Sequence, residues 1–170
     1  KASDRLEAII FGAGDLSASQ RARVDSNFDP VSDYPGDFWH FARFQVVTAA
    51  RAAGIDAIDA PYPAYKDSEG YRRSAVHASL LGFDGKWAIH PSQIPIAHEV
   101  FSPTEAEIAD ARASIETYRR AEAEGVGAIG RDGRLVDAAH MRLAENTLYK
   151  AALASDERGG AGAVRLSPAG

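Results

Sequence analysis

The chain has 170 residues, of which 45% are hydrophobic and 25% are charged, a composition typical of a globular protein rather than a disordered or fibrous one. It contains no cysteine, which excludes disulfides, thiolate metal sites and a thiol nucleophile. Its formal charge of −5 and its interspersed acidic and basic residues leave no electrostatic footprint for DNA or RNA, so we expect no nucleic-acid partner.

The sequence shows no targeting signal. Lys1 is not followed by a charged and then apolar leader, and no apolar run approaches the ~18 residues that cross a bilayer. We therefore expect no membrane partner and a cytoplasmic location.

Short apolar runs alternate with helical patterns in the first hundred residues. We expect strands at residues 6–11, 55–60 and 86–90, and helices at residues 37–53 and 68–81. Glycine or proline follows each predicted strand and helix, and these residues commonly terminate both kinds of element. This order predicts βαβ units in a parallel sheet, and therefore an α/β fold. Three strands cannot close a barrel.

A different pattern follows residue 101. Ser102-Pro103-Thr104-Glu105 has the form of a capping box with proline at the first helical position, so a long helix is expected after it. The Asp-Gly pair at 132–133 predicts a small hairpin over residues 128–136, before a last helix. The expected organisation is residues 1–101, residues 102–154, and a disordered glycine-rich tail at 155–170.

Ligand sites of parallel α/β sheets lie at the carboxyl ends of the strands, which directs attention to Asp15, Asp59 and His90. Asp15 lies in Gly12-Ala-Gly-Asp15, where glycines let backbone N–H groups face an anion beside a carboxylate. Equally, Asp15 could cap a turn and the glycines could shape a loop. For Asp59, hydrogen bonding to nearby backbone is the favoured interpretation.

The remaining polar candidates have ordinary explanations when each is considered alone. His90 is more often a buried, hydrogen-bonded imidazole than a base or ligand. The five histidines show no zinc-type pairing. Asp137 lies where the N-cap of the last helix is expected, and this capping role alone accounts for an aspartate at that position.

Four segments together carry a resemblance. They are Phe11-Gly-Ala-Gly-Asp15-Leu-Ser-Ala-Ser19, residues 49–59, Gly82-Phe-Asp-Gly-Lys86-Trp-Ala-Ile-His90-Pro-Ser-Gln-Ile94, and Asp132-Gly-Arg-Leu-Val-Asp137. In this order the chain resembles the citrate lyase beta subunit-like family of the HpcH/HpaI aldolase superfamily, from about residue 6 to residue 154. Residues 35–40 and 137–140 look closest to malyl-CoA and β-methylmalyl-CoA lyases.

The resemblance implies a TIM (β/α)8 barrel, of which this chain holds the last three strands, followed by a C-terminal helical lid with a small hairpin. A complete barrel takes ~250 residues. The chain therefore looks like a fragment, a truncated product or one partner of a split enzyme.

The resemblance also implies an activity. Family members are carbon–carbon lyases that use Mg2+, with Mn2+ as a possible substitute, and cleave a 3-hydroxyacyl-CoA thioester such as malyl-CoA to acetyl-CoA and glyoxylate. Asp15 matches one metal ligand, while a glutamate ligand and a substrate-binding arginine belong to the absent half. Asp137 matches a lid aspartate that acts as acid/base in a neighbouring subunit, which implies a homo-oligomer, either trimer or hexamer.

Two further assignments are hypotheses. Backbone N–H groups of Ala13 and Gly14, beside Asp15, are expected to bind the carboxylate of the oxo acid. Coenzyme A, as part of the substrate, is expected near Ile89, His90 and Pro91.

Three alternatives stay open. The acyl group could be citramalyl-CoA or a citryl thioester instead of malyl-CoA. The chain could be a catalytically incomplete module that completes another chain's site with Asp137. A CoA-independent pyruvate aldolase would use the same barrel, although the lid sequence argues against it.

Overall fold

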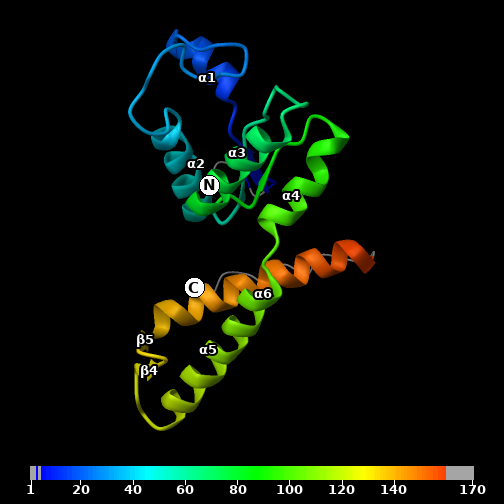
Figure 1. The fold of residues 1–170 in the computed structure, drawn as a ribbon. Coiled ribbons are helices and arrows are strands. Elements are labelled where there is room, and N and C mark those ends of the chain that lie inside the picture. Colours follow the sequence, from blue (N-terminus) through cyan, green and yellow to red (C-terminus); the bar gives the residue numbers. More distant parts are fainter. Residues whose placement is uncertain (1–2, 4, 160–170) are drawn as a thin grey trace. The chain divides into compact units, whose positions relative to one another are not determined.

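The computed structural model describes residue 3 and residues 5–159. The chain forms two compact units, Lys1–Phe101 and Ser102–Gly170, which appear in Figure 1 as blue to green and green to orange segments.

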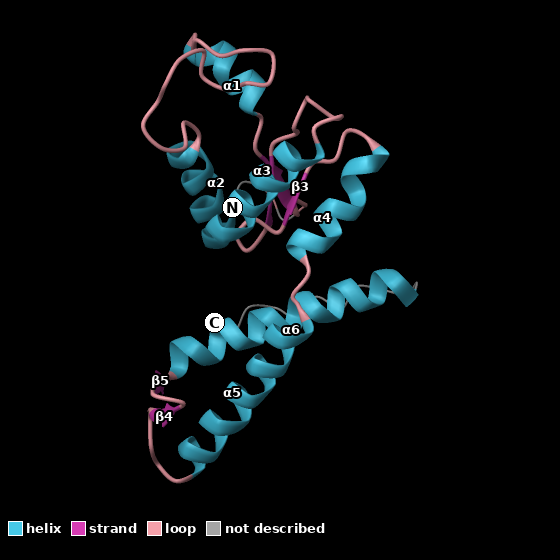
Figure 2. Ribbon diagram, in the orientation of Figure 1, coloured by secondary structure: helices cyan, strands magenta, loops and turns pink. Residues whose placement is uncertain are grey.

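The first unit contains a parallel sheet in the order β1-β2-β3 (Figure 2). Its strands are β1 (Ala8–Ile10), β2 (Asp56–Asp59) and β3 (Gly85–Lys86). The parallel pairing agrees with the predicted βαβ order, and the strands are shorter than predicted. The expected strand at 86–90 is wrong beyond Lys86. After the Trp87 N–H donates to the carbonyl of Asp59, the chain turns into the 3-10 helix η1 (Pro91–Gln93).

Two helices connect the strands. They are α2 (His40–Ala53) and α3 (Ser68–Leu81), and both contact the sheet. Each ends at a glycine in the left-handed region, Gly54 at φ 63° and Gly82 at φ 100°, where a side chain would be strained. The bounds of α3 are those predicted from sequence, because Asp67 caps its start through the N–H of Gly70.

Two further helices were not predicted. Helix α1 (Ala13–Gln20) begins directly after Gly12, where the sequence indicated a turn or loop. The sequence shows no helical spacing of apolar residues here, because α1 buries only Ala13 and Ser17. Helix α4 (Ile94–Phe101) follows η1 and contacts α3.

The core of the first unit lies between the sheet and its helices. Its buried hydrophobic residues are Phe11, Ala13, Trp39, Val47, Ala50, Ile55, Ala57, Ala60, Ala78 and Phe83. The rings of Phe11 and Trp39 meet edge to face with centroids 5.8 Å apart. The indole N–H of Trp39 also donates to the carbonyl of Phe28 at 2.8 Å, which fixes the loop between α1 and α2 against the core.

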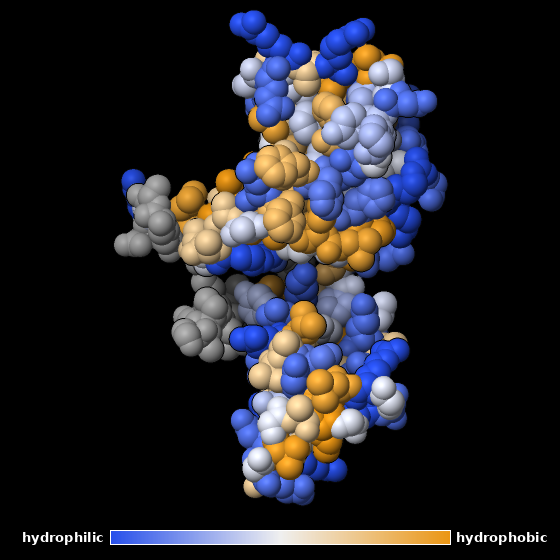
Figure 3. Space-filling view, turned by 90° about the vertical axis from the view of Figure 1, so that its left-hand side faces the viewer, coloured by the Kyte–Doolittle hydropathy of each residue, from blue (hydrophilic) through white to orange (hydrophobic). Residues whose placement is uncertain are grey.

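In the part of the chain that the structure describes, the second face of the sheet is open. Ile10, Ile58 and Gly85 are neighbours in register, so they share one face of the pleated sheet. Ile10 is 50% exposed, and the following Trp87 is 49% exposed. Figure 3 shows, in orange, hydrophobic side chains that reach the molecular surface. An apolar sheet face of this kind is normally covered by another layer.

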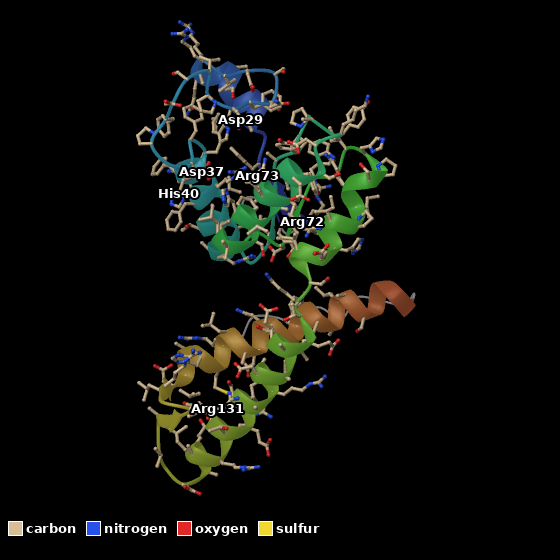
Figure 4. All side chains as sticks on the ribbon, in the orientation of Figure 1. Asp29, Asp37, His40, Arg72, Arg73 and Arg131 are labelled. Atoms are coloured by element: carbon tan, nitrogen blue, oxygen red, sulfur yellow. The ribbon has the colours of Figure 1, made fainter. Side chains whose placement is uncertain are left out.

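The second unit is a helical pair with a hairpin between its helices. It contains α5 (Glu105–Ala123), β4 (Ile129–Arg131), β5 (Arg134–Val136) and α6 (Ala138–Gly159). Ala111, Ile115 and Ala144 form its buried core, with Met141 and Leu148 packed against them. Arg131, labelled in Figure 4, joins the hairpin to α5 through Asp110 at 2.9 Å.

Two expectations for the second unit need correction. The capping box is Thr104 with Glu107, with both reciprocal bonds present, and not Ser102 with Glu105. Both pairs have the same spacing, so the pattern alone could not choose. The tail predicted to be disordered from residue 155 is helical through Gly159, and residues 160–170 lie outside the described residues. No helix within residues 5–159 is long and apolar enough to cross a membrane.

Candidate active site

The carboxyl ends of the three parallel strands lie at one edge of the sheet, because parallel strands run in the same direction. Helix α1 follows β1, a proline-rich loop follows β2, and η1 follows β3. Strands β1 and β3 are separated by β2, which sets them ~10 Å apart. The sequence-predicted residues of the first unit follow all three strands: Ala13, Gly14 and Asp15 begin α1 after β1, Asp59 ends β2, and Ile89, His90 and Pro91 lie after β3 at the start of η1.

Asp15 is the third residue of α1 and is exposed. Its Oδ2 lies 3.3 Å from the point that a Cβ on Gly12 would occupy, so the carboxylate is folded back toward the start of its own helix. No side chain caps α1, which rules out the interpretation of Asp15 as a capping residue. A carboxylate in the first turn does stabilise a helix through the helix dipole, so this ordinary role stands beside a metal-binding one.

Ala13 and Gly14 occupy the first two positions of α1, where backbone N–H groups have no partner within a helix. Such N–H groups are suited to an anion. Gly14 also has a packing reason to be glycine, because a Cβ there would lie 2.9 Å from Cζ of Phe28. The sequence predicted that the glycines either let a ligand approach or shape a loop, and did not predict this contact with Phe28.

Asp59, at the end of β2, forms a buried ion cluster that the sequence did not predict. Its side chain is fully buried and binds Nε of Arg43 at 2.9 Å and Nζ of Lys86 at 2.6 Å. It therefore pairs with two cations instead of nearby backbone. Arg43 also reaches Asp37 at 3.0 Å, and Asp37 is labelled beside the start of α2 in Figure 4.

Burial lowers the pKa of Lys86, although the adjacent Asp59 carboxylate opposes that shift. Lys86 also donates to the carbonyl of Ala60 at 2.7 Å. Its ammonium group is therefore bound by two groups of the protein itself, the Asp59 carboxylate and the Ala60 carbonyl. The cluster joins β2, β3 and α2. Breaking such a buried pair by removing one partner costs ~3–5 kcal/mol, which indicates a structural function.

The loops after β2 and β3 meet through His90. Its ring stacks on Tyr65 with centroids 4.8 Å apart, and its Nδ1 lies 2.8 Å from Oγ of Ser92. His90 is the N-cap of η1 and is exposed. It is therefore not the buried imidazole that the pattern favoured.

Gln93 and the backbone hold these two loops together. The fully buried Gln93 side chain accepts from the N–H of Ile89 at 2.8 Å and donates to the carbonyl of Tyr62 at 3.0 Å. Ile89 itself is 47% exposed. The sequence-predicted group of Ile89, His90 and Pro91 therefore forms an exposed surface on a fixed backbone.

Tyr65 and Lys66 extend this surface and were missed by the sequence interpretation. Nζ of Lys66 lies 5.9 Å from the centroid of the Tyr65 ring. An open hollow of about 530 Å³ is lined by Pro63, Ala64, Tyr65, Lys66 and Asp67. The available signal was an aromatic residue followed by a lysine in a loop after a predicted strand.

Asp137 belongs to the second unit, between β5 and α6. Its Oδ1 accepts from the N–H groups of Ala139 at 2.9 Å and His140 at 3.2 Å, so the predicted capping role is confirmed. The same oxygen lies 2.8 Å from Nδ1 of His140. Hydrogen bonds from the His140 side chain and then from backbone N–H groups hold the pKa of Asp137 below its ordinary value.

Known proteins similar in sequence to this chain show its family. Residues 1–91 match the family model for HpcH/HpaI aldolase/citrate lyase. An L-malyl-CoA/beta-methylmalyl-CoA lyase of Rhodobacter capsulatus is 39% identical over 162 residues, which cover 90% of this chain and 51% of that protein. A (3S)-malyl-CoA thioesterase of Cereibacter sphaeroides is 46% identical over 150 residues, which cover 88% and 50%.

A solved structure shows the same likeness. The CitE protein from Mycobacterium tuberculosis, in complex with magnesium, acetoacetate and coenzyme A, superimposes with a TM-score of 0.66 at 30% identity, covering 84% of this chain and 51% of that one. The chain thus spans about half the length of the curated relatives it matches.

Proposed function

Because the chain belongs to the HpcH/HpaI aldolase/citrate lyase family, we propose that it is the C-terminal part of a magnesium-dependent carbon–carbon lyase acting on a coenzyme A thioester. Malyl-CoA, cleaved to acetyl-CoA and glyoxylate, is the preferred substrate, with citramalyl-CoA and citryl-CoA as alternatives. The observation that carries the proposal is an exposed carboxylate, Asp15, on the helix that follows β1.

The proposed fold of the complete protein is a TIM barrel in which β1, β2 and β3 are the last three strands. The open sheet face supports this, since Ile10 is half-exposed on it. Five further strands would cover that face and close the sheet. Residues 102–159 would then serve as the helical lid.

Asp15 is the proposed magnesium ligand. A carboxylate is a hard oxygen donor of the kind that Mg2+ prefers, and this one has no hydrogen bond to a capping partner. Within the described residues, no three histidine, aspartate or glutamate side chains form a group that could hold a metal ion. A second carboxylate, on a strand before β1, completes the proposed site.

Cleavage of malyl-CoA breaks the bond between its hydroxyl-bearing carbon and the carbon next to the thioester. The hydroxyl loses a proton and becomes the aldehyde of glyoxylate, and the enolate of acetyl-CoA gains a proton at carbon, so the proton count does not change. Magnesium supplies a Lewis acid for the charge that develops on oxygen. Asp137 exchanges the proton, and the N–H groups of Ala13 and Gly14 bind the carboxylate.

Coenzyme A is proposed to lie along Ile89, His90 and Pro91. Tyr65 and Lys66 adjoin these residues, and they extend the proposal. The exposed rings provide apolar contact area, while the Lys66 ammonium group suits a phosphate.

A product assay on the complete protein tests the reaction. With malyl-CoA and Mg2+ we expect glyoxylate and acetyl-CoA in equal amounts, with no release of free thiol. EDTA should stop the reaction. Absence of glyoxylate from malyl-CoA, citramalyl-CoA and citryl-CoA alike would reject the lyase.

Thioester hydrolysis is the second candidate, favoured by the 46% identity to a malyl-CoA thioesterase. In that reaction water attacks the thioester carbonyl, the carbon–sulfur bond breaks, and malate and free coenzyme A are released. The same assay distinguishes the two, because only hydrolysis produces a thiol that reacts with a disulfide reagent.

Replacement of the proposed metal ligand gives a direct test. Asp15→Asn keeps the shape of the side chain and removes its charge, so we expect at least a tenfold loss in Mg2+ affinity, measured by titration calorimetry on the complete protein. Asp33→Asn is a control, since Asp33 is also exposed. Equal Mg2+ affinity in the wild type and Asp15→Asn would remove Asp15 from the site.

The proposal places Asp137 in the active site of a neighbouring subunit of a homo-oligomer. Asp15→Asn and Asp137→Ala should each be inactive alone, whereas a mixture that has been dissociated and reassembled should recover part of the activity. Recovery requires sites that take one intact residue from each variant. A mixture as inactive as its components would mean that both residues act from the same chain.

A further inference from the structure

At the start of α6, the two oxygens of the Asp137 carboxylate differ in their hydrogen bonds. Oδ1 of Asp137 accepts from two backbone N–H groups, those of Ala139 and His140, and it also contacts Nδ1 of His140. Among the described contacts of Asp137, none involves Oδ2. One oxygen is therefore occupied in capping the helix, and the other makes no hydrogen bond within the described residues.

We propose that His140 is a positioning residue, which fixes the Asp137 carboxylate so that Oδ2 is presented for proton transfer. This inference rests on the proposed function of Asp137. It extends that function, because neither the sequence pattern nor the comparisons assign a role to His140.

Geometry indicates the direction of the hydrogen bond. Nδ1 of His140 lies 2.8 Å from Oδ1 of Asp137 but 3.4 Å from the backbone nitrogen of Asp137. The shorter contact is that of a donor and a carboxylate, so the ring proton belongs on Nδ1. Both side chains are about half-exposed, at 50% for His140 and 41% for Asp137, so the pair is accessible to a reactant.

The contact also affects the charge state. The His140 hydrogen bond is the first cause of the lowered pKa of Asp137, followed by the bonds from backbone N–H groups. Asp137 therefore rests as a carboxylate at neutral pH. A capping box also uses the N3 side chain as an acceptor for the N-cap N–H, but that contact is the longer one here, at 3.4 Å, against 2.8 Å to the Asp137 carboxylate.

A titration independent of activity tests the coupling. The Asp137 carboxyl carbon is followed by NMR against pH in wild type, His140→Ala and His140→Asn. We expect a higher Asp137 pKa in His140→Ala and a partial return in His140→Asn, because the asparagine amide can donate from about the position of Nδ1. An Asp137 pKa that is the same in wild type and His140→Ala overturns the proposal.

Kinetics of the complete enzyme test the consequence. His140→Ala should lower kcat at least tenfold with KM little changed, and His140→Asn should recover part of kcat. Arg142→Ala, also exposed on α6, is the control for nonspecific effects on the helix. If His140→Ala lowers the melting temperature but keeps wild-type kcat, His140 is only part of the cap and the proposal is wrong. A wild-type enzyme without lyase activity would reject the proposed function instead, while the titration would still decide whether the two side chains are coupled.

Discussion

The Tyr71 side chain is fully buried beside the ion cluster, with its ring centroid 5.9 Å from Nζ of Lys86. Its hydroxyl has no hydrogen-bond partner among the described residues. Burial, and then the charge of Asp59, raise the pKa of Tyr71 to about 12. The hydroxyl of Tyr62 is different, because it donates to Asp67 at 2.9 Å. Burial and this bond also raise the pKa of Tyr62 to about 12.

These two tyrosines predict opposite effects at neutral pH. Tyr71→Phe removes an unsatisfied hydroxyl and should leave the free energy of unfolding unchanged or higher, whereas Tyr62→Phe removes a hydrogen bond to the Asp67 carboxylate and should lower it. Urea unfolding at pH 7 measures both. A larger loss for Tyr71→Phe would mean that its hydroxyl does have a partner.

Alkaline pH provides a second comparison. A tyrosine pKa raised in the folded state contributes stability that is present below the unfolded value of 10.0 and is lost as pH rises toward about 12. Wild type should therefore lose stability across this range, and Tyr71→Phe should lose less. Equal slopes of unfolding free energy against pH would contradict the raised pKa.

Substitution of Gly14 tests whether packing or helix propensity has the larger effect on stability. Alanine normally stabilises a helix relative to glycine, but the Cβ of Gly14→Ala would meet Phe28 at 2.9 Å. Overpacking of this kind costs ~1–3 kcal/mol, measurable by chemical denaturation. Gly127→Ala, in the loop before β4, is a control without a close contact, since nothing lies within 4 Å of its Cβ. Stabilisation by Gly14→Ala would show that the Phe28 ring moves away without penalty.

At the scale of elements, helix boundaries depend on single side chains. Helix α5 begins at Glu105, because Thr104 and Glu107 bond each other's backbone N–H groups at 3.2 and 2.7 Å. The backbone bond from Thr104 also lowers the pKa of Glu107. In α6, the corresponding positions are Asp137 and His140, where the N3 residue is an imidazole.

The position of the capping box is testable with a matched pair. Thr104→Ala should cost ~0.5–2 kcal/mol of unfolding free energy. Ser102→Ala should change it by less than ~0.5 kcal/mol, because Ser102 lies outside the box. The reverse order of effects would restore the sequence-based assignment to Ser102 and Glu105.

At the scale of the whole molecule, the exposed sheet face is the feature that the proposed barrel would cover. The chain contains no cysteine, so Ile10→Cys introduces a single thiol on that face. In the 170-residue chain this thiol should react readily with a maleimide, and in the complete protein it should be protected, as peptide mass spectrometry would show. Leu80→Cys is the exposed control, since Leu80 is 81% exposed. Equal labelling of the Ile10→Cys variant in both forms of the protein would contradict a barrel closed over this face.

Some features followed from the sequence alone. The parallel strand order, the bounds of α3 and the hairpin before Asp137 were predictable, because apolar spacing, capping residues and an Asp-Gly turn are local signals. The family was predictable from four motifs in register. The metal-binding role of Asp15 and the coenzyme A role of Ile89, His90 and Pro91 stay predictions.

Other features were decided only by the tertiary structure. Helix α1 was missed because it buries few residues, and the Arg43–Asp59–Lys86 cluster was missed because its members are far apart in sequence. The same holds for the stacking of Tyr65 on His90 and the contact of Gly14 with Phe28. Local periodicity determines which segments form strands or helices, whereas ion pairs and packing between distant residues depend on where the folded chain brings them together.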